Sequence, residues 1–119
     1  MSILVTKNND VLIVMPVGRL DAYSAPEADE RIAQHINEGA RHIVMDFAQA
    51  NYISSAGLRV LINAVKKLKS LGGAFALCNP SGSIQQVLEM SGLSDVIPMF
   101  GSLQEAIRTM PGGAGTPAA

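Results

Sequence analysis

The residues best suited to chemistry are two neighbouring serines, Ser54 and Ser55, in the segment Asn51–Arg59. A predicted helix begins at about Ser55, so both hydroxyls lie where backbone N–H groups lack helical partners and the helix dipole favours negative charge. A second polar segment, Gly18–Ser24, carries Asp21 and also precedes a predicted helix. Loops that lead from strands into helices line the carboxyl edge of a parallel sheet, which is where such folds place their sites.

Three roles are open to a serine in this position. Serine is a preferred helix N-cap, so either hydroxyl could simply bond a backbone N–H group. A nucleophilic serine needs a base such as histidine within reach, but Ile53 replaces the first glycine of a Gly-x-Ser-x-Gly elbow. His35 and His42 are also expected at the far end of the sheet. The third role is a phosphate acceptor, because a phosphoserine adds about −1.5 to −2 charges and changes which partner binds.

Composition restricts the class of protein. Hydrophobic residues make up 48% of the 119 residues, which excludes intrinsic disorder and predicts one packed domain. The net charge of −1 gives no electrostatic reason to expect nucleic-acid binding. Without a long apolar run or a secretion signal, we expect a cytoplasmic protein with no direct membrane insertion. With one cysteine and two histidines, we expect no metal site, no cofactor and no catalytic residue.

Strands and helices are predicted to alternate along the chain. Apolar runs predict strands at residues 3–7, 11–17, 42–47, 74–78 and 96–100. Proline cannot donate a ladder hydrogen bond, so Pro16 is expected near a strand end or an unpaired edge. Capping boxes of the type Ser-x-x-Glu or Ser-x-x-Gln predict helix starts at Ser24, Ser83 and Ser102.

This alternation defines the expected fold class. The order β-β-α-β-α-β-α-β-α predicts an α/β fold, with a mixed, mostly parallel sheet of four to five strands and about four helices. Residues 1–110 form the expected domain. Residues 111–119 are rich in proline, glycine and alanine and are expected to be a disordered tail.

The second predicted helix, from about Ser55 to Gly72, has apolar residues at helical spacing. They are Leu58, Leu61, Ile62, Val65 and Leu68. Arg59 and Asn63 are expected to point away from this buried stripe, with Val60 at its side. An apolar Val60 outside the core would suit a docking patch, so the expected partner surface is the first turns of this helix and the adjoining loops.

Several motifs together resemble the STAS family, and within it the bacterial anti-sigma factor antagonists. In chain order they are Gly18-x-Leu20-Asp21, Asp46-Phe47, Ile53-Ser54-Ser55-Ala56-Gly57-Leu58, Gly72-Gly73 and Met90-Ser91-Gly92-Leu93. The resemblance runs from about residue 3 to residue 110. It implies a STAS-like fold and a regulator that acts by binding other proteins.

The resemblance also implies partners and site residues. Such antagonists bind an anti-sigma factor that carries a GHKL-type serine kinase domain, and this binding releases the sigma factor. The kinase phosphorylates a serine at the start of the second helix, which ends binding, and a PP2C-type phosphatase restores it. The matching serine here is Ser55, and Asp21 matches an acidic residue of the neighbouring loop. The best-studied antagonists have aspartate directly before the acceptor, where this chain has Ser54, so Ser54 is the alternative acceptor.

The predicted partner-binding residues come from this resemblance and from the helix pattern, on a protein expected to be a monomer or weak dimer. They are Asp21, Ser54, Ser55, Ala56, Gly57, Arg59, Val60 and Asn63. A constitutive role on the same fold stays open as an alternative, either as the STAS subunit of a membrane lipid-transport ATPase or in another STAS signalling complex. Such a subunit would copurify with transporter components rather than with a kinase and a phosphatase.

Overall fold

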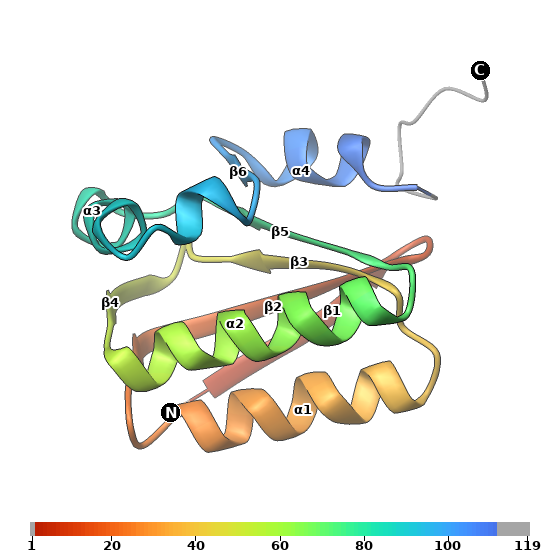
Figure 1. Ribbon diagram of the computed structural model, residues 1–119, viewed down its shortest axis with the longest axis horizontal. Coiled ribbons are helices and arrows are strands. Elements are labelled where there is room, and N and C mark those ends of the chain that lie inside the picture. The colour runs from red at the N-terminus through yellow and green to blue at the C-terminus, as the bar shows by residue number, and fades with distance from the viewer. Residues whose placement is uncertain (1, 112–119) are drawn as a thin grey trace.

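The chain forms a six-stranded mixed sheet with helices on both faces (Figure 1). The computed structural model describes residues 2–111, so residues 112–119 of the predicted tail lie outside the described part. The strands are β1 (Ser2–Asn8), β2 (Val11–Leu20), β3 (His42–Asp46), β4 (Ala50–Ile53), β5 (Ala74–Cys78) and β6 (Met99–Phe100). The sheet order is β1-β2-β3-β5-β6, with β4 paired to β2, and within residues 2–111 only the β1–β2 pair is antiparallel.

The helices cover the two faces of the sheet unequally. They are α1 (Ala25–Asn37), α2 (Ser55–Ser70), α3 (Gly82–Met90), the 3-10 turn η1 (Leu93–Asp95) and α4 (Leu103–Thr109). Helices α1 and α2 lie side by side on one face, and α4 lies on the other (Figure 1). The predicted α/β class, with a mostly parallel sheet and four helices, is therefore confirmed. Among residues 2–111, no helix has both the length and the apolar character that crossing a lipid bilayer requires.

Two strands differ from the prediction. The sequence was expected to give four or five strands, but β4 adds a sixth, in a segment where we expected a loop. Its four residues place two exposed side chains between buried Ala50 and Ile53, which is too short a pattern to indicate a strand. The last strand contains only Met99–Phe100, because Leu93–Asp95 forms a 3-10 turn and Pro98 lacks a donor.

Strand β2 has different parallel partners along its length. Its residues Val11–Val14 pair with β3, and Gly18–Leu20 pair with β4. Of the two places predicted for Pro16, the strand end is wrong, because Pro16 is buried inside β2 opposite Ile3 of β1. Pro16 instead falls between the two parallel stretches, where β2 has no partner on that side and a missing N–H group leaves no ladder bond broken.

The core has two parts, one on each face of the sheet. The larger part lies between the sheet and α1, α2 and α3, and includes the fully buried residues Leu12, Ile43, Leu61, Leu68 and Leu88. The smaller part lies between the sheet and α4, and includes Val11, Val44, Cys78 and Ile107.

The predicted helix caps hold in part. Ser102 caps α4, because its Oγ accepts a hydrogen bond from Glu105 N at 3.2 Å. Helix α3 is capped by Ser81 and not by the predicted Ser83.

The outermost strand β1 pairs with β2 on one side only. On its free side, Arg31 of α1 donates a hydrogen bond from Nη1 to the Ile3 carbonyl oxygen at 2.6 Å. The same guanidinium nitrogen lies 3.9 Å from the Glu27 carboxylate, one turn earlier on α1. Arg31 therefore satisfies one backbone acceptor of the sheet edge.

Candidate functional site

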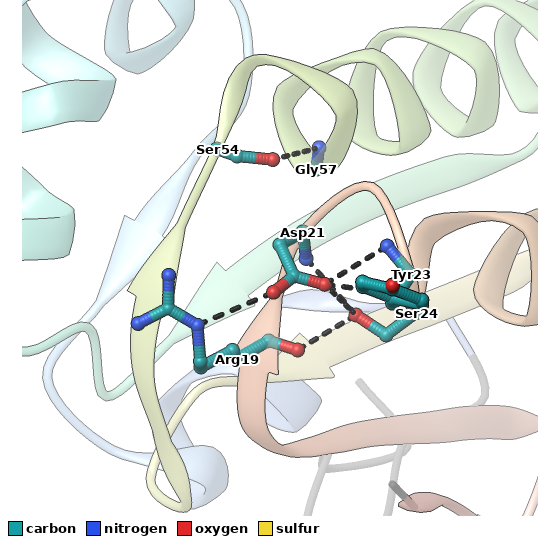
Figure 2. A network of polar contacts seen from close by, with 6 residues as sticks. All are labelled: Arg19, Asp21, Tyr23, Ser24, Ser54 and Gly57. Atoms are coloured by element: carbon teal, nitrogen blue, oxygen red, sulfur yellow. Dashed lines mark hydrogen bonds and ion pairs between the residues drawn. The ribbon is translucent and has the colours of Figure 1, made fainter.

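Two chain segments meet where β2 and β4 end. The β2–α1 loop follows Leu20, and the β4–α2 junction follows Ile53, which pairs with Leu20 in the parallel ladder. The Ser54 N–H donates to the Leu20 carbonyl oxygen at 3.0 Å, so the two segments are directly bonded. The segments expected to form the site, Gly18–Ser24 and Asn51–Arg59, are thus neighbours at the carboxyl end of parallel strands (Figure 2).

The two serines at the start of α2 have different roles. Ser54 has an extended backbone, and its Oγ accepts a hydrogen bond from Gly57 N at 3.3 Å, so Ser54 is the N-cap of the helix (Figure 2). Ser55 is the first residue of α2, and its side chain is exposed. Its hydroxyl makes no hydrogen bond to any of residues 2–111. The helix start therefore holds one structural hydroxyl and one hydroxyl that is free to react.

Gly57 allows α2 to approach β2 and β4 closely. A Cβ atom at this position would lie 2.5 Å from the Leu20 carbonyl oxygen and 2.7 Å from Ile53 Cγ1, both far below a van der Waals contact. Gly57 is also buried, so the prediction that it belongs to a partner-binding surface is wrong. Its role is to set the position of the first turn of α2 against the sheet.

The buried face of α2 is rotated relative to the prediction. Val60 is fully buried and Ala64 is 3% exposed, whereas Ile62 is 37% exposed and Leu58 is half-buried. The prediction of Val60 as an exposed docking residue is therefore wrong, because its side chain packs in the main core. Leu61, Val65 and Leu68 are buried as predicted.

Asp21 organises the β2–α1 loop. Its Oδ1 accepts hydrogen bonds from Tyr23 N at 3.0 Å and Ser24 N at 3.3 Å, and its Oδ2 lies 3.2 Å from Arg19 Nε (Figure 2). Partial burial acts to raise the pKa of Asp21, but these backbone hydrogen bonds and the Arg19 charge outweigh it and hold the pKa below its usual value. Asp21 is thus ionised at neutral pH and shapes the loop beside Ser55.

The predicted capping box at Ser24 is wrong. Ser24 precedes α1, but its hydroxyl caps no N–H group of the helix. The Ser24 Oγ instead donates to the Arg19 carbonyl oxygen at 2.6 Å and accepts from Asp21 N at 2.9 Å. Ser24 is 2% exposed, so its hydroxyl closes the loop back onto β2.

Three side chains of this surface were not found by sequence reasoning. The Arg19 guanidinium lies over the Tyr52 ring, 4.0 Å from its centroid, and so links β2 to β4 from the outside. Tyr23 is 95% exposed at the tip of the loop, and Tyr52 is 41% exposed. The pairing of Arg19 with Tyr52 in the parallel register could not be known before β4 was recognised as a strand.

The remaining predicted site residues are arranged along the start of α2. Arg59 and Asn63 are exposed as expected, and Ala56 is half-buried. The Asn63 Nδ2 reaches Asp29 Oδ1 of α1 at 3.5 Å. Arg59 makes no ion pair or hydrogen bond with any residue of the described range.

The two histidines lie at the other end of the sheet, as expected. His35 near the end of α1 and His42 at the start of β3 line one open cavity of about 400 Å³. Neither imidazole is therefore placed to act as a base for Ser54 or Ser55. Within residues 2–111, no three His, Cys, Asp or Glu side chains gather in a way that could hold a metal ion.

Cys78 is a buried core residue at the end of β5. Burial raises the pKa of its thiol to about 12, and the neighbouring Asp46 carboxylate adds to the effect. Asp46 is itself buried and accepts from Ala48 N at 2.9 Å and Asn79 Nδ2 at 3.0 Å. The thiol is therefore uncharged at neutral pH and has no role at the candidate site.

Comparison with known proteins connects this geometry to one family. The STAS domain model matches residues 2–106. BtrV of Bordetella bronchiseptica, named as a candidate anti-sigma factor antagonist, is 30% identical over 106 residues, which cover 89% of this chain and 91% of BtrV. The anti-sigma-B factor antagonist of Bacillus subtilis is 30% identical over 93 residues, covering 78% of this chain and 84% of that protein.

A solved structure shows the same fold. The crystal structure of a candidate anti-sigma factor antagonist from Thermotoga maritima superposes with a TM-score of 0.87 at 26% identity, covering 91% of this chain and 93% of that one. The STAS match covers most of the chain, and the similarity extends over nearly the whole length of the relatives. The chain therefore belongs to the STAS domain family, among the anti-sigma factor antagonists.

Proposed function

We propose that the protein is a cytoplasmic regulator that binds an anti-sigma factor with a GHKL-type serine kinase domain, and that phosphorylation of Ser55 ends this binding. In the kinase step, the Ser55 hydroxyl oxygen bonds to the γ-phosphorus of ATP, the bond to the β-phosphate breaks and ADP leaves. A PP2C-type phosphatase hydrolyses the phosphoserine and restores the binding form.

The exposed, unbonded hydroxyl of Ser55 is the observation that supports this proposal. A kinase needs an acceptor oxygen that its catalytic groups can reach, and Ser55 offers one on the first residue of α2. Ser54 is a poorer acceptor, because its oxygen already accepts from Gly57 N and phosphorylation would disturb the N-cap.

The charge of a phosphate suits an on-off device at this position. Phosphoserine carries about −1.5 to −2 charges at neutral pH. At a helix N-terminus these charges are tolerated or slightly stabilising, by about 0.3–1 kcal/mol. At a desolvated contact with another protein, the same charges can cost several kcal/mol, and each 1.4 kcal/mol lowers affinity about tenfold. The fold therefore persists while binding is lost.

Kinase treatment followed by site mapping tests the proposal. The protein is incubated with its cognate kinase and ATP, and the modified residue is identified by mass spectrometry. We expect one phosphate on Ser55, none in Ser55→Ala and normal incorporation in Ser54→Ala. Phosphate on another residue, or none with a kinase proven to bind the protein, would show that the proposal is wrong.

Binding measurements test the switch itself. Ser55→Asp should fold normally and bind the anti-sigma factor at least about tenfold more weakly than the wild type, whereas Ser55→Ala should bind like the wild type. If Ser55→Asp binds with wild-type affinity, the constitutive role on a STAS complex is favoured instead.

A further inference from the structure

Arg59 is the cation of α2 that lies nearest to Ser55 along the helix. Residues four positions apart share one helix face, with Cβ atoms about 5–6 Å apart. Helical side chains tilt toward the helix N-terminus, so the Arg59 side chain extends over the turn that Ser55 begins. Because Arg59 is exposed, its long side chain can adopt the rotamer that brings the guanidinium to an oxygen on Ser55.

No acidic side chain of the described residues pairs with the Arg59 guanidinium. Its guanidinium makes no ion pair or hydrogen bond with any of residues 2–111, and the first turn of α2 contains no acidic residue. The other arginine of the site, Arg19, is already engaged, since its Nε lies 3.2 Å from Asp21 Oδ2 and its guanidinium covers Tyr52. A new anion on Ser55 would therefore find one free guanidinium on its own helix face.

We infer that Arg59 binds the phosphate of phosphorylated Ser55 and that this pair withdraws Arg59 from the surface offered to the partner. The inference rests on the proposed function, because it requires a phosphate on Ser55. An anion four residues before a cation is the favourable order on a helix. A guanidinium can also donate two parallel hydrogen bonds to phosphate oxygens, which favours arginine over lysine at such a pair.

The pair changes the charge of the docking surface in two ways. Before phosphorylation, Arg59 presents a free positive charge that suits an acidic group of the partner. After phosphorylation, the guanidinium is held by an anion of about −1.5 to −2 charges, so the same surface becomes net negative. An acidic partner group that contacted Arg59 thus loses its cation and faces a phosphate.

A phosphate titration tests this inference without any kinase. Phosphoserine is incorporated genetically at position 55 in the otherwise wild-type full chain, in Arg59→Gln and in Lys66→Gln, and the ³¹P resonance is followed against pH. Lys66→Gln is the matched control, because it removes one exposed positive charge from the same helix, about 16 Å from residue 55 along the helix axis.

The expected result is a lower titration midpoint where Arg59 is present, because the guanidinium favours the dianionic phosphate. We expect the wild-type midpoint to lie about 0.3–0.7 pH units below that of Arg59→Gln, the size expected for exposed opposite charges about 4 Å apart. Lys66→Gln should titrate like the wild type. Arg59→Lys should recover part of the shift, and added salt should reduce the wild-type shift.

Equal midpoints in the wild type and Arg59→Gln would overturn the inference, as would an equal effect of Lys66→Gln. Circular dichroism of each variant verifies that the fold is unchanged, and Arg59→Lys repeats the comparison with a retained charge. Because the phosphate is installed genetically, these outcomes are independent of kinase specificity. A kinase that modifies another residue would refute the proposed function, while the titration alone decides the role of Arg59.

Discussion

Replacing Gly57 with alanine should destabilise the protein through one close contact. The added Cβ would lie 2.5 Å from the Leu20 carbonyl oxygen and 2.7 Å from Ile53 Cγ1. The Leu20 oxygen cannot move freely, because it accepts from Ser54 N at 3.0 Å. The chain must therefore move α2 away from β2, or give up the bond that joins the two segments of the site.

The size of the effect follows from two opposing contributions. Alanine is favoured over glycine inside a helix by up to about 1 kcal/mol. Overpacking in a closely packed region costs about 1–3 kcal/mol, and the first atom met here is a backbone oxygen rather than a flexible side chain. We expect Gly57→Ala to lower the free energy of unfolding by about 1–2 kcal/mol.

Gly82→Ala is the matched control. Gly82 begins α3, and a Cβ there would meet no atom within 4 Å. This variant should be neutral or up to about 1 kcal/mol more stable than the wild type. Urea denaturation followed by circular dichroism gives both free energies of unfolding. The packing argument is refuted if Gly57→Ala equals or exceeds the wild type in stability, or changes it by the same amount as Gly82→Ala.

Three further experiments test other parts of the structure. Ser54→Ala should lower the free energy of unfolding by about 1 kcal/mol, because it removes the N-cap of α2. Ser55→Ala should change the free energy of unfolding by less than about 0.5 kcal/mol. Equal urea midpoints for the two variants would contradict the roles assigned to the two serines. Asp21 has a lowered pKa in the folded protein, so its stabilising effect is present above the ordinary aspartate pKa of 3.8 and is lost as the pH falls through the folded pKa. The difference in unfolding free energy between the wild type and Asp21→Asn should therefore be constant near neutral pH and shrink below about pH 4, and a difference that stays constant in acid would argue against these contacts. Cys78 is buried, and its thiol pKa is raised to about 12. A colourimetric thiol reagent at pH 8 should therefore react with Cys78 only after urea is added. Rapid reaction in native buffer would show instead that β5 opens readily.

Much of the fold follows from local sequence signals. The buried face of α1 was predictable because Ala28, Ile32 and Ile36 are apolar and four residues apart, and all three are buried. The start of α2 at Ser55 was also predictable, because a serine pair precedes a long apolar pattern. The site could be placed between two loops because parallel strands bring their carboxyl ends together.

Other features depended on contacts between distant residues. On α2, both Val60 and Ile62 are apolar, so periodicity alone allowed more than one face, and the sheet selected the face with Val60. The cap at Ser24 failed because its hydroxyl found an acceptor on Arg19, five residues earlier in β2. The buried role of Gly57 was hidden because a glycine carries no signal about the backbone that approaches it.

The bond between Arg31 and the Ile3 carbonyl oxygen has a consequence for behaviour at high concentration. An open strand margin presents backbone groups that a second polypeptide can join, which is a common route to aggregation. Here a guanidinium held by α1 occupies one of those acceptors, and a chain arriving at β1 would have to displace it and bring its own backbone next to a positive charge. Arg31 thus opposes edge-to-edge growth at β1, the outermost strand of the sheet next to β2.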